Sequence, residues 1–318
     1  MLRRIANHLF WAARNLERAE WRARLVNVNY HLLVESPPQN PQAWAPLLAI
    51  TGEREVFEER YTSADETSVL TFYTFDDENP SSIRSCIRAA RESARALRHR
   101  ISSELWLELN TLYLDSLSWS PVTLEASGIY TFFTELGGRF YRIAGITSDT
   151  LTRDRGYDFF IIGKMLERTE SVARLLDVKY HFLLPRVEDV GGSVDLLQWA
   201  ALLRSASALE AYRRVYGNAI EVERVVEMLL FDESFPRSAR FAMNRLEASL
   251  ERIAALSANG ARPPAEAPAL ASAKLANLLK SSCVTGVIDG GLHEYLLQIE
   301  DECTNIGEML SAEYLRFE

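Results

Sequence analysis

The chain has 318 residues, 47% of them hydrophobic, which is enough to bury a substantial core. Its formal net charge is −9, and its arginines alternate with acidic residues instead of forming a basic tract. Nucleic-acid binding is therefore not expected. No apolar run reaches the roughly eighteen residues of a membrane-spanning helix, so no membrane association is expected either.

The three cysteines predict a reducing compartment. Cys86, Cys283 and Cys303 are dispersed and show no CxxC spacing, which does not suit a disulfide framework. The first residues form a mixed amphipathic pattern and not the apolar core of a signal peptide. We therefore expect a cytoplasmic location.

Taken in chain order, nearly every segment predicts helix, because apolar residues recur at spacings of three and four between Gly and Pro breakers. No turn dipeptide lies between alternating strands, so a sheet is not expected. The sequence predicts an all-α fold, a multi-helix bundle of about eleven helices. Their ranges are 2–34, 42–62, 64–74, 80–114, 122–146, 150–184, 193–216, 218–230, 236–258, 266–285 and 291–316.

The first predicted helix and the sixth share a repeated segment. Residues 16–31 read LERAEWRARLVNVNYH, and residues 166–181 read LERTESVARLLDVKYH, with ten of the sixteen positions identical. A second element follows each copy at an offset of 156. It matches Phe75, Asp76, Pro80, Ser82 and Arg84 with Phe231, Asp232, Pro236, Ser238 and Arg240. We predict one domain over 1–318, built from two pseudo-symmetric repeats at approximately 1–100 and 151–255.

The repeated helix carries a polar stripe on an otherwise apolar side. With 100° per residue, its charged positions fall within an arc of roughly 80°. The stripe defines a candidate paired polar site made of Glu17, Glu20, Arg24, His31, Glu167, Glu170, Arg174 and His181. Buried charges there must be paired, and two interpretations stay open. The stripe forms a structural lattice of ion pairs, or it lines a cleft and contacts a ligand.

Metal and cofactor binding are not predicted. A di-iron helical site places His three residues after Glu, whereas His31 lies eleven residues after Glu20, roughly 16 Å along the axis. The sequence also lacks a nucleophile elbow, a P-loop, a GxGxxG turn and an HExxH pair. The catalytic residues, if any, are therefore unknown, and the sequence does not decide whether the chain is an enzyme.

The second repeated element predicts a helix start, because Pro lies in the first turn and Ser suits a cap. The alternative is an anion-binding site at the helix N-terminus, formed by Ser82, Arg84, Ser238 and Arg240.

Together these patterns resemble the bacterial alpha-E family, an all-helical family described as a domain of unknown function. The resemblance is carried by the segments 8–20 and 163–170, by the FDxxxPxSxR element, and by the patch at 103–110. It implies a gene neighbourhood or fusion with a circularly permuted ATP-grasp protein. It also implies a possible transglutaminase-like partner and a role in ATP-dependent formation of an amide-linked product.

Three functions follow from the residues and the resemblance. The first is an accessory or substrate-holding component of an ATP-grasp-linked system that forms peptide or amide bonds. The second is a helical enzyme of the aminoacyl or peptidyl transferase type that uses the Glu and Arg stripes. The third is a purely structural scaffold.

Overall fold

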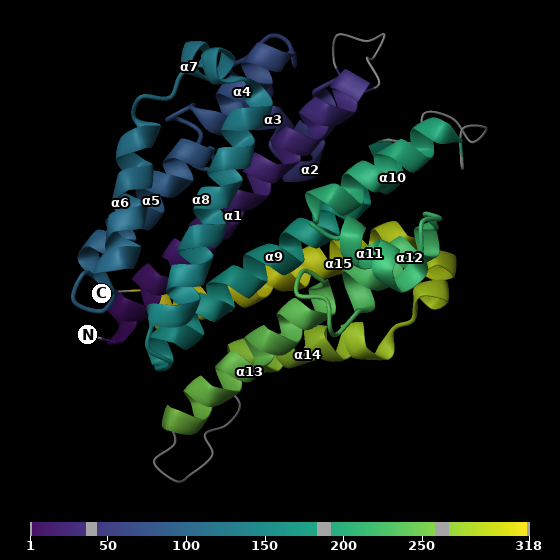
Figure 1. Cartoon of the computed structure of the whole chain (residues 1–318). Helices are drawn as coiled ribbons and strands as arrows, with labels where there is room; N and C mark the ends of the chain where they lie inside the picture. The colour runs from purple at the N-terminus through teal and green to yellow at the C-terminus, as the bar shows by residue number, and fades with distance from the viewer. Residues whose placement is uncertain (1, 36–42, 183–191, 258–266, 317–318) are drawn as a thin grey trace. The chain divides into compact units, whose positions relative to one another are not determined.

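The computed structural model describes residues 2–35, 43–182, 192–257 and 267–316. Within these ranges all regular elements are helices and there is no strand (Figure 1). The all-α prediction is confirmed, since helices account for 81% of the chain. Among the described residues, no helix combines the length and the apolar character needed to cross a bilayer.

The chain divides into two compact units, which are described separately. The first unit consists of residues 8–157, and the second consists of residues 1–7 and 158–318.

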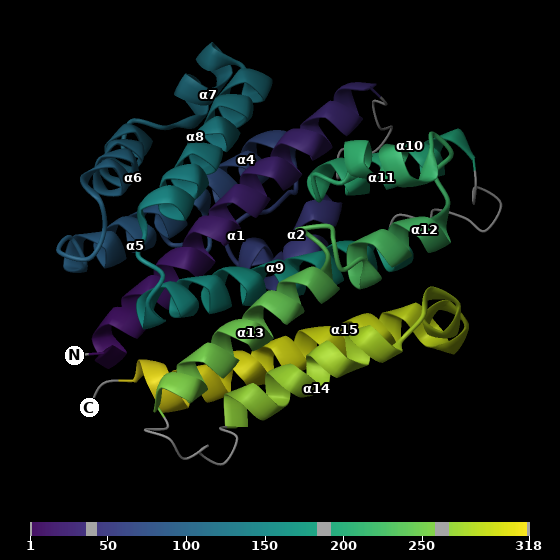
Figure 2. The ribbon, with the colours of Figure 1, turned by 60° about the horizontal axis from the view of Figure 1, so that its bottom comes forward.

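The first unit is built around α5, whose apolar face is completely buried. Ile83, Cys86, Ile87 and Ala90 of this helix are all 0% exposed. α5 packs on α6, and α6 packs on α8 (Figures 1 and 2). The helices are α1 (Leu2–Glu35), α2 (Ala45–Thr51), α3 (Arg54–Glu58), α4 (Glu66–Thr74), α5 (Ile83–Ala96), α6 (Ser103–Ser116), α7 (Pro121–Ser127) and α8 (Ile129–Thr150).

In the second unit α13 packs on α14, and α14 packs on α15 (Figure 2). Two π-helical turns, Glu227–Phe231 and Ser311–Leu315, follow α12 and α15. The helices are α9 (Arg155–Phe182), α10 (Ser193–Ser205), α11 (Leu209–Tyr216), α12 (Val222–Val226), α13 (Ala239–Ser257), α14 (Ala267–Ser281) and α15 (Val284–Leu310).

The described ranges contain fifteen α-helices and not about eleven, because non-helical residues interrupt several of the predicted helices. Gly52 adopts a left-handed conformation with φ 69° and ends α2 inside the predicted helix 42–62. The Ser102 side chain accepts a hydrogen bond from the Leu105 amide and starts α6 inside the predicted helix 80–114. Ser207, with φ 51°, separates α10 from α11.

The last part of each unit has the same local layout, although the sequence comparison did not align these segments. Ser120 and Cys283 are extended N-cap residues, and each is followed by seven helical residues. A glycine with positive φ then interrupts the helix, Gly128 at 80° and Gly291 at 107°. A long helix follows both glycines, so an offset of 163 places corresponding residues of α8 and α15. Superposition of the complete units stays a prediction.

Candidate functional site

The polar stripe of α1 is buried in the first unit. Glu17 is 3% exposed and Glu20 is 9% exposed. Glu20 forms an ion pair with Arg24 one turn further along the same helix. Near the end of α1, the His31 ring packs edge-on against Tyr130, with 4.7 Å between the ring centroids.

The corresponding stripe of α9 has the same ion pair. Glu167 is 5% exposed, and the Arg174 guanidinium lies 2.7 Å from the Glu170 carboxylate. His181 belongs to the last turn of α9, but its side chain lies outside the described residues. The stripe does continue to Asp177, at the position of Asn27 in the first copy.

In the second unit, α15 supplies two further titratable groups that meet this stripe. Asp177 Oδ1 lies 2.5 Å from His293 Nδ1, and Arg174 Nε lies 3.4 Å from Glu300 Oε2. Arg174 contacts Glu300 and Asp177 contacts His293, so residue numbers increase along α9 while they decrease along α15. The two helices therefore run antiparallel here. His293 and Glu300 are seven residues apart and share one face of α15. We call Glu170, Arg174, Asp177, His293 and Glu300 the α9–α15 cluster.

Glu300 is a half-buried carboxylate of this cluster. Its side chain is 19% exposed, and its Oε2 lies 3.4 Å from Arg174 Nε, somewhat beyond the usual hydrogen-bond length. Burial and the negative charges of Asp177 and Glu170 raise the pKa of Glu300 to about 7, although Arg174 opposes the shift. Glu300 therefore changes its charge near neutral pH.

The neighbour of His293 favours the charged form of that side chain, whereas the surroundings of Glu300 favour its neutral form. The hydrogen bond with Asp177 raises the pKa of His293, because the carboxylate stabilises the imidazolium form. Its side chain is 32% exposed, so the pair lies at the edge of the cluster. The cluster thus contains a carboxyl group that gives up a proton near pH 7 and, beside it, a histidine that is hydrogen-bonded to a carboxylate.

The arrangement suits proton transfer and the binding of a charged substrate. A carboxyl group that titrates near the working pH is well suited to act as a general base or acid. A guanidinium binds carboxylate or phosphate oxygens, and Arg174 is 35% exposed. Among the described residues, no group of three or more His, Cys, Asp or Glu side chains is arranged to hold a metal ion.

Sequence reasoning missed His293 and Glu300, because no repeated motif marks them. With Gly128 aligned to Gly291, the first unit has Tyr130 in place of His293 and Gly137 in place of Glu300. The available signal was their spacing of seven residues on a predicted helix, but it does not indicate the helix that they face.

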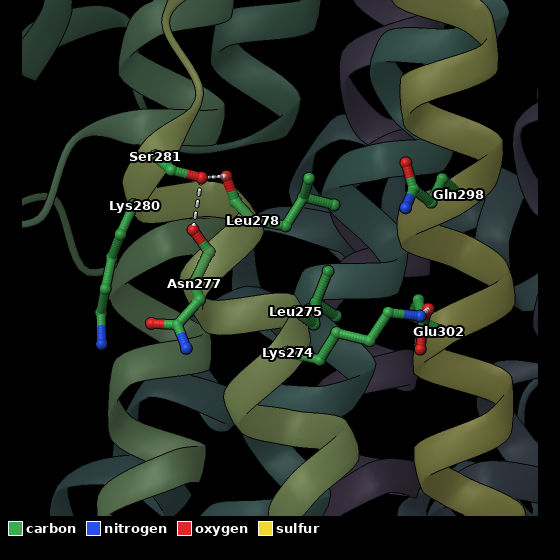
Figure 3. Close-up of a pocket in the computed structure, with 8 residues that line it drawn as sticks. All are labelled: Lys274, Leu275, Asn277, Leu278, Lys280, Ser281, Gln298 and Glu302. Carbon is green, nitrogen blue, oxygen red and sulfur yellow. Dashed lines mark hydrogen bonds and ion pairs between the residues drawn. The ribbon is translucent and has the colours of Figure 1, made fainter.

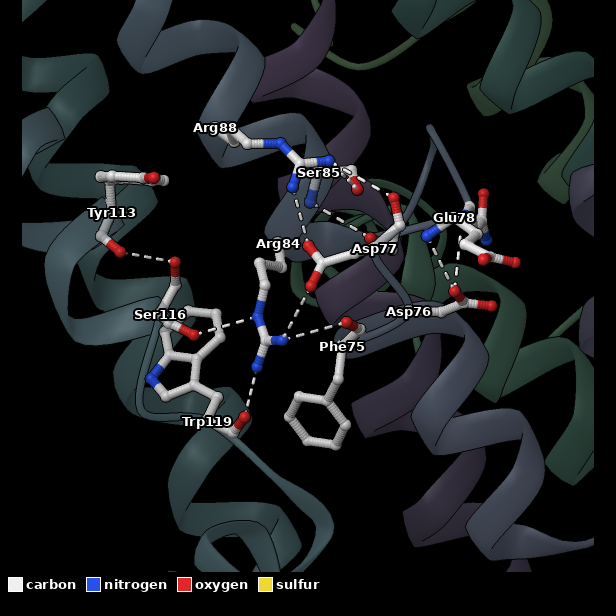
Figure 4. Close-up of polar contacts among 12 residues, drawn as sticks. Phe75, Asp76, Asp77, Glu78, Arg84, Ser85, Arg88, Tyr113, Ser116 and Trp119 are labelled. Carbon is white, nitrogen blue, oxygen red and sulfur yellow. Dashed lines mark hydrogen bonds and ion pairs between the residues drawn. The ribbon is translucent and has the colours of Figure 1, made fainter.

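The second repeated element forms a clamp around Arg84 in the first unit (Figure 4). Arg84 Nε donates to the Ser116 carbonyl at 3.0 Å, and Nη1 donates to the Phe75 carbonyl at 3.2 Å. Nη2 donates to the Trp119 carbonyl. Ser82 is completely buried and caps α5 by accepting from the Ser85 amide at 3.1 Å.

The second unit repeats this clamp with fewer contacts. Arg240 Nη1 donates to the Phe231 carbonyl at 3.4 Å, and Ser238 accepts from the Phe241 amide at 3.0 Å. The Arg240 Nε is buried and has no hydrogen-bond partner among the described residues. In both units the Ser and Arg side chains bind their own chain, which favours the helix-start interpretation over anion binding.

The two repeated elements also contact one another within each unit. Arg18 Nη1 lies 3.4 Å from the Ser81 hydroxyl, and Arg168 Nη1 donates to the Pro236 carbonyl at 2.8 Å. These arginines follow Glu17 and Glu167 directly, so each Glu-Arg dipeptide fixes the loop before α5 or α13. Both arginines belong to the positions shared by the repeats, but sequence analysis did not single them out.

A groove lies between α14 and α15 (Figure 3). It consists of two adjoining cavities of about 450 and 500 Å³, which share Leu278, Ser281 and Gln298. Its charges are balanced locally, because Lys274 pairs with Glu302 across the groove. Lys280 pairs with Glu247 of α13. Both lysines of the groove are therefore paired with carboxylates, while the exposed Glu294 lines the second cavity.

Comparisons with known proteins agree with these motifs. A family described as a predicted alpha-helical domain with a conserved ER motif matches residues 1–315. Curated relatives include uncharacterized proteins from Mycobacterium bovis and Mycobacterium tuberculosis, 26% identical over 268 residues. The match covers 79% of this chain but only 30% of each relative, so the relatives are much longer proteins. No solved structure matches the chain.

Proposed function

The chain belongs to the alpha-E family, and from that premise we propose that it is an accessory component that holds substrate in an ATP-dependent amide-bond-forming system. Its partner in this proposal is a circularly permuted ATP-grasp protein. The length of the mycobacterial relatives supports a role beside other protein parts, since the matched region is 30% of each.

The observation that carries the proposal is the α9–α15 cluster. It combines the Arg174 guanidinium with three carboxylates and an imidazole, and its side chains are partly accessible. A guanidinium has five N–H donors. The Arg174 side chain is 35% exposed, so a negatively charged substrate group can approach it from solvent.

Amide formation also needs a proton acceptor. An ammonium group must lose one proton before its nitrogen can attack a carboxyl group activated by the partner. A carboxylate at the position of Glu300 takes up that proton and becomes the neutral acid. When the C–N bond forms, the activating group leaves with the bonding electrons and takes up the second proton of the nitrogen, so the product is a neutral amide. The pKa of Glu300, about 7, suits this exchange near neutral pH.

Glu300 also favours a second candidate, a helical enzyme that performs the transfer step itself. The two candidates differ in what the partner does alone. A holding component speeds a reaction that the partner can still perform slowly, whereas an enzyme is needed for any product to form.

The test is reconstitution of the chain with the ATP-grasp protein encoded beside it. ATP consumption and the condensed product are followed by mass spectrometry, with and without the chain. The proposal expects ATP-dependent product whose rate rises when the chain is added. An equal rate in its absence would exclude a role in the reaction.

A further inference from the structure

A row of arginines runs along the outer face of α5 and just beyond its end. Arg88, Arg91 and Arg95 are spaced by three and four residues, so they share an arc of roughly 60° over about 10 Å of the helix, and Arg98 follows just after the helix ends. We call these four residues the arginine stripe. The opposite face of α5 is buried in the core of the first unit.

The stripe carries more positive charge than its ion pairs neutralise. Arg88 pairs with Asp77 at 2.8 Å, while Arg91 and Arg95 share Glu92. Arg98 has no carboxylate within ion-pair distance among the described residues. The side chains of Arg88 and Arg95 are 43% and 64% exposed. A positive surface of this kind is unusual on a chain with net charge −9.

The fold does not require these arginines, as the second unit demonstrates. At the offset of 156, α13 keeps Arg240 in place of the clamp residue Arg84. The four stripe positions correspond to Asn244, Glu247, Glu251 and Ala254. Of these five positions, only Arg84 is matched by an arginine in the second copy, so the stripe is specific to the first copy.

The geometry points to an acidic peptide segment of a partner protein as the occupant of this surface. We propose that an extended segment rich in Glu or Asp lies along α5 and pairs its carboxylates with the arginine stripe. Guanidinium groups match carboxylates in shape as well as charge. The helical part of the stripe, about 10 Å long, corresponds to about three extended residues.

The aromatic rings beside the stripe favour a peptide over a nucleic acid. Arg91 lies 5.3 Å from the Trp106 ring and 5.1 Å from the Tyr113 ring, and Arg98 lies 4.9 Å from Trp106. Single-stranded nucleic acids bind by stacking bases on open aromatic faces. Here guanidinium groups already cover the rings, so the exposed chemistry is positive charge.

The test uses the full chain and a fluorescein-labelled octaglutamate peptide, with binding measured by fluorescence anisotropy at low salt. The wild-type chain binds the peptide, and added salt weakens the complex. The double variant Arg88→Glu with Arg95→Glu reverses the two most exposed charges of the stripe. We expect its binding to be weaker by roughly tenfold or more.

The matched control reverses two exposed arginines of α11, Arg213→Glu with Arg214→Glu, and changes the net charge equally. When the variants are compared at about 0.15 M salt, its affinity should stay within about twofold of the wild type, because the Debye length is then only about 8 Å and long-range charge is screened. Circular dichroism checks folding, and the milder Arg95→Gln replaces the double variant if that chain is unfolded.

Two kinds of result would overturn the proposal. One is that the wild-type chain does not bind the peptide at low salt, or that the stripe variant and the control variant lose peptide affinity equally. The other is tighter binding of octathymidylate than of octaglutamate with loss in the stripe variant, which would identify a nucleic-acid surface. This test needs no ATP-grasp partner and does not depend on the proposed function.

Discussion

In the second unit, the titratable α9–α15 cluster lies where α9 meets α15. The first unit has no counterpart to the two cluster residues that α15 contributes. Tyr130 stands where α15 has His293, and Gly137 stands where it has Glu300. The first unit in turn has the arginine stripe, which the second unit lacks. The caps, the clamps and the Glu-Arg dipeptides occur in both. Features common to both units therefore hold helices together, and features found in one unit are candidates for function.

The largest effect should come from removing the clamp that both units share. Arg84→Ala leaves the carbonyls of Phe75, Ser116 and Trp119 without their donor. We expect a loss of about 3 kcal/mol in the free energy of unfolding, measured by urea denaturation. Arg240→Ala should cost less, about 1–2 kcal/mol, because Arg240 makes fewer contacts. A larger loss for Arg240→Ala would reverse this ranking of the two clamps.

The N-caps provide a sharper comparison, because they accept the same bond but differ in one further contact. Ser82 and Ser238 are both 0% exposed and accept hydrogen bonds of 3.1 and 3.0 Å from backbone amides. Ser238 also donates a hydrogen bond to the Asp232 carbonyl. Each Ser→Ala variant should lose about 1–2 kcal/mol in the free energy of unfolding, with the larger loss for Ser238→Ala. Urea denaturation of both variants provides the check, and a larger loss for Ser82→Ala would contradict this account.

These local features are the ones that could be predicted from the sequence. The pairs Glu20–Arg24 and Glu170–Arg174 lie within one helix, so a spacing of four predicts them. Caps are also local, which explains why the helix starts at α5 and α13 were predictable. The all-α class followed from periodicity, but short breaks such as Gly52 were hidden inside predicted helices.

The α9–α15 cluster could not be predicted from the sequence, because its contacts join residues that are far apart along the chain. His293 and Asp177 are 116 positions apart, and periodicity does not specify which helices pack together. The two units also diverge most in their last helices, so the internal comparison ended before α15. The common layout of cap, short helix, glycine and long helix becomes visible only in the backbone angles of Gly128 and Gly291.

A smaller effect should appear in the pH dependence of stability. Folded Glu300 has a pKa of about 7, above its ordinary value of 4.5, so the folded chain binds this proton more tightly. Its contribution is complete below the ordinary pKa and is lost as the pH rises through about 7. Glu300→Gln should remove this loss, so its melting temperature relative to wild type should rise between about pH 5 and pH 8. A constant difference across this range would mean that Glu300 titrates normally.

The proposed function depends most directly on the rate of ATP-dependent amide formation with Glu300→Gln. The matched control is Glu308→Gln, the same substitution at an exposed position of α15 outside the cluster. If Glu300 accepts the proton of the amine, the first variant should lose about tenfold or more of the rate, since general base catalysis contributes about a hundredfold or more. The control should keep the wild-type rate. Equal rates for the wild type and both variants would contradict a functional role for the α9–α15 cluster.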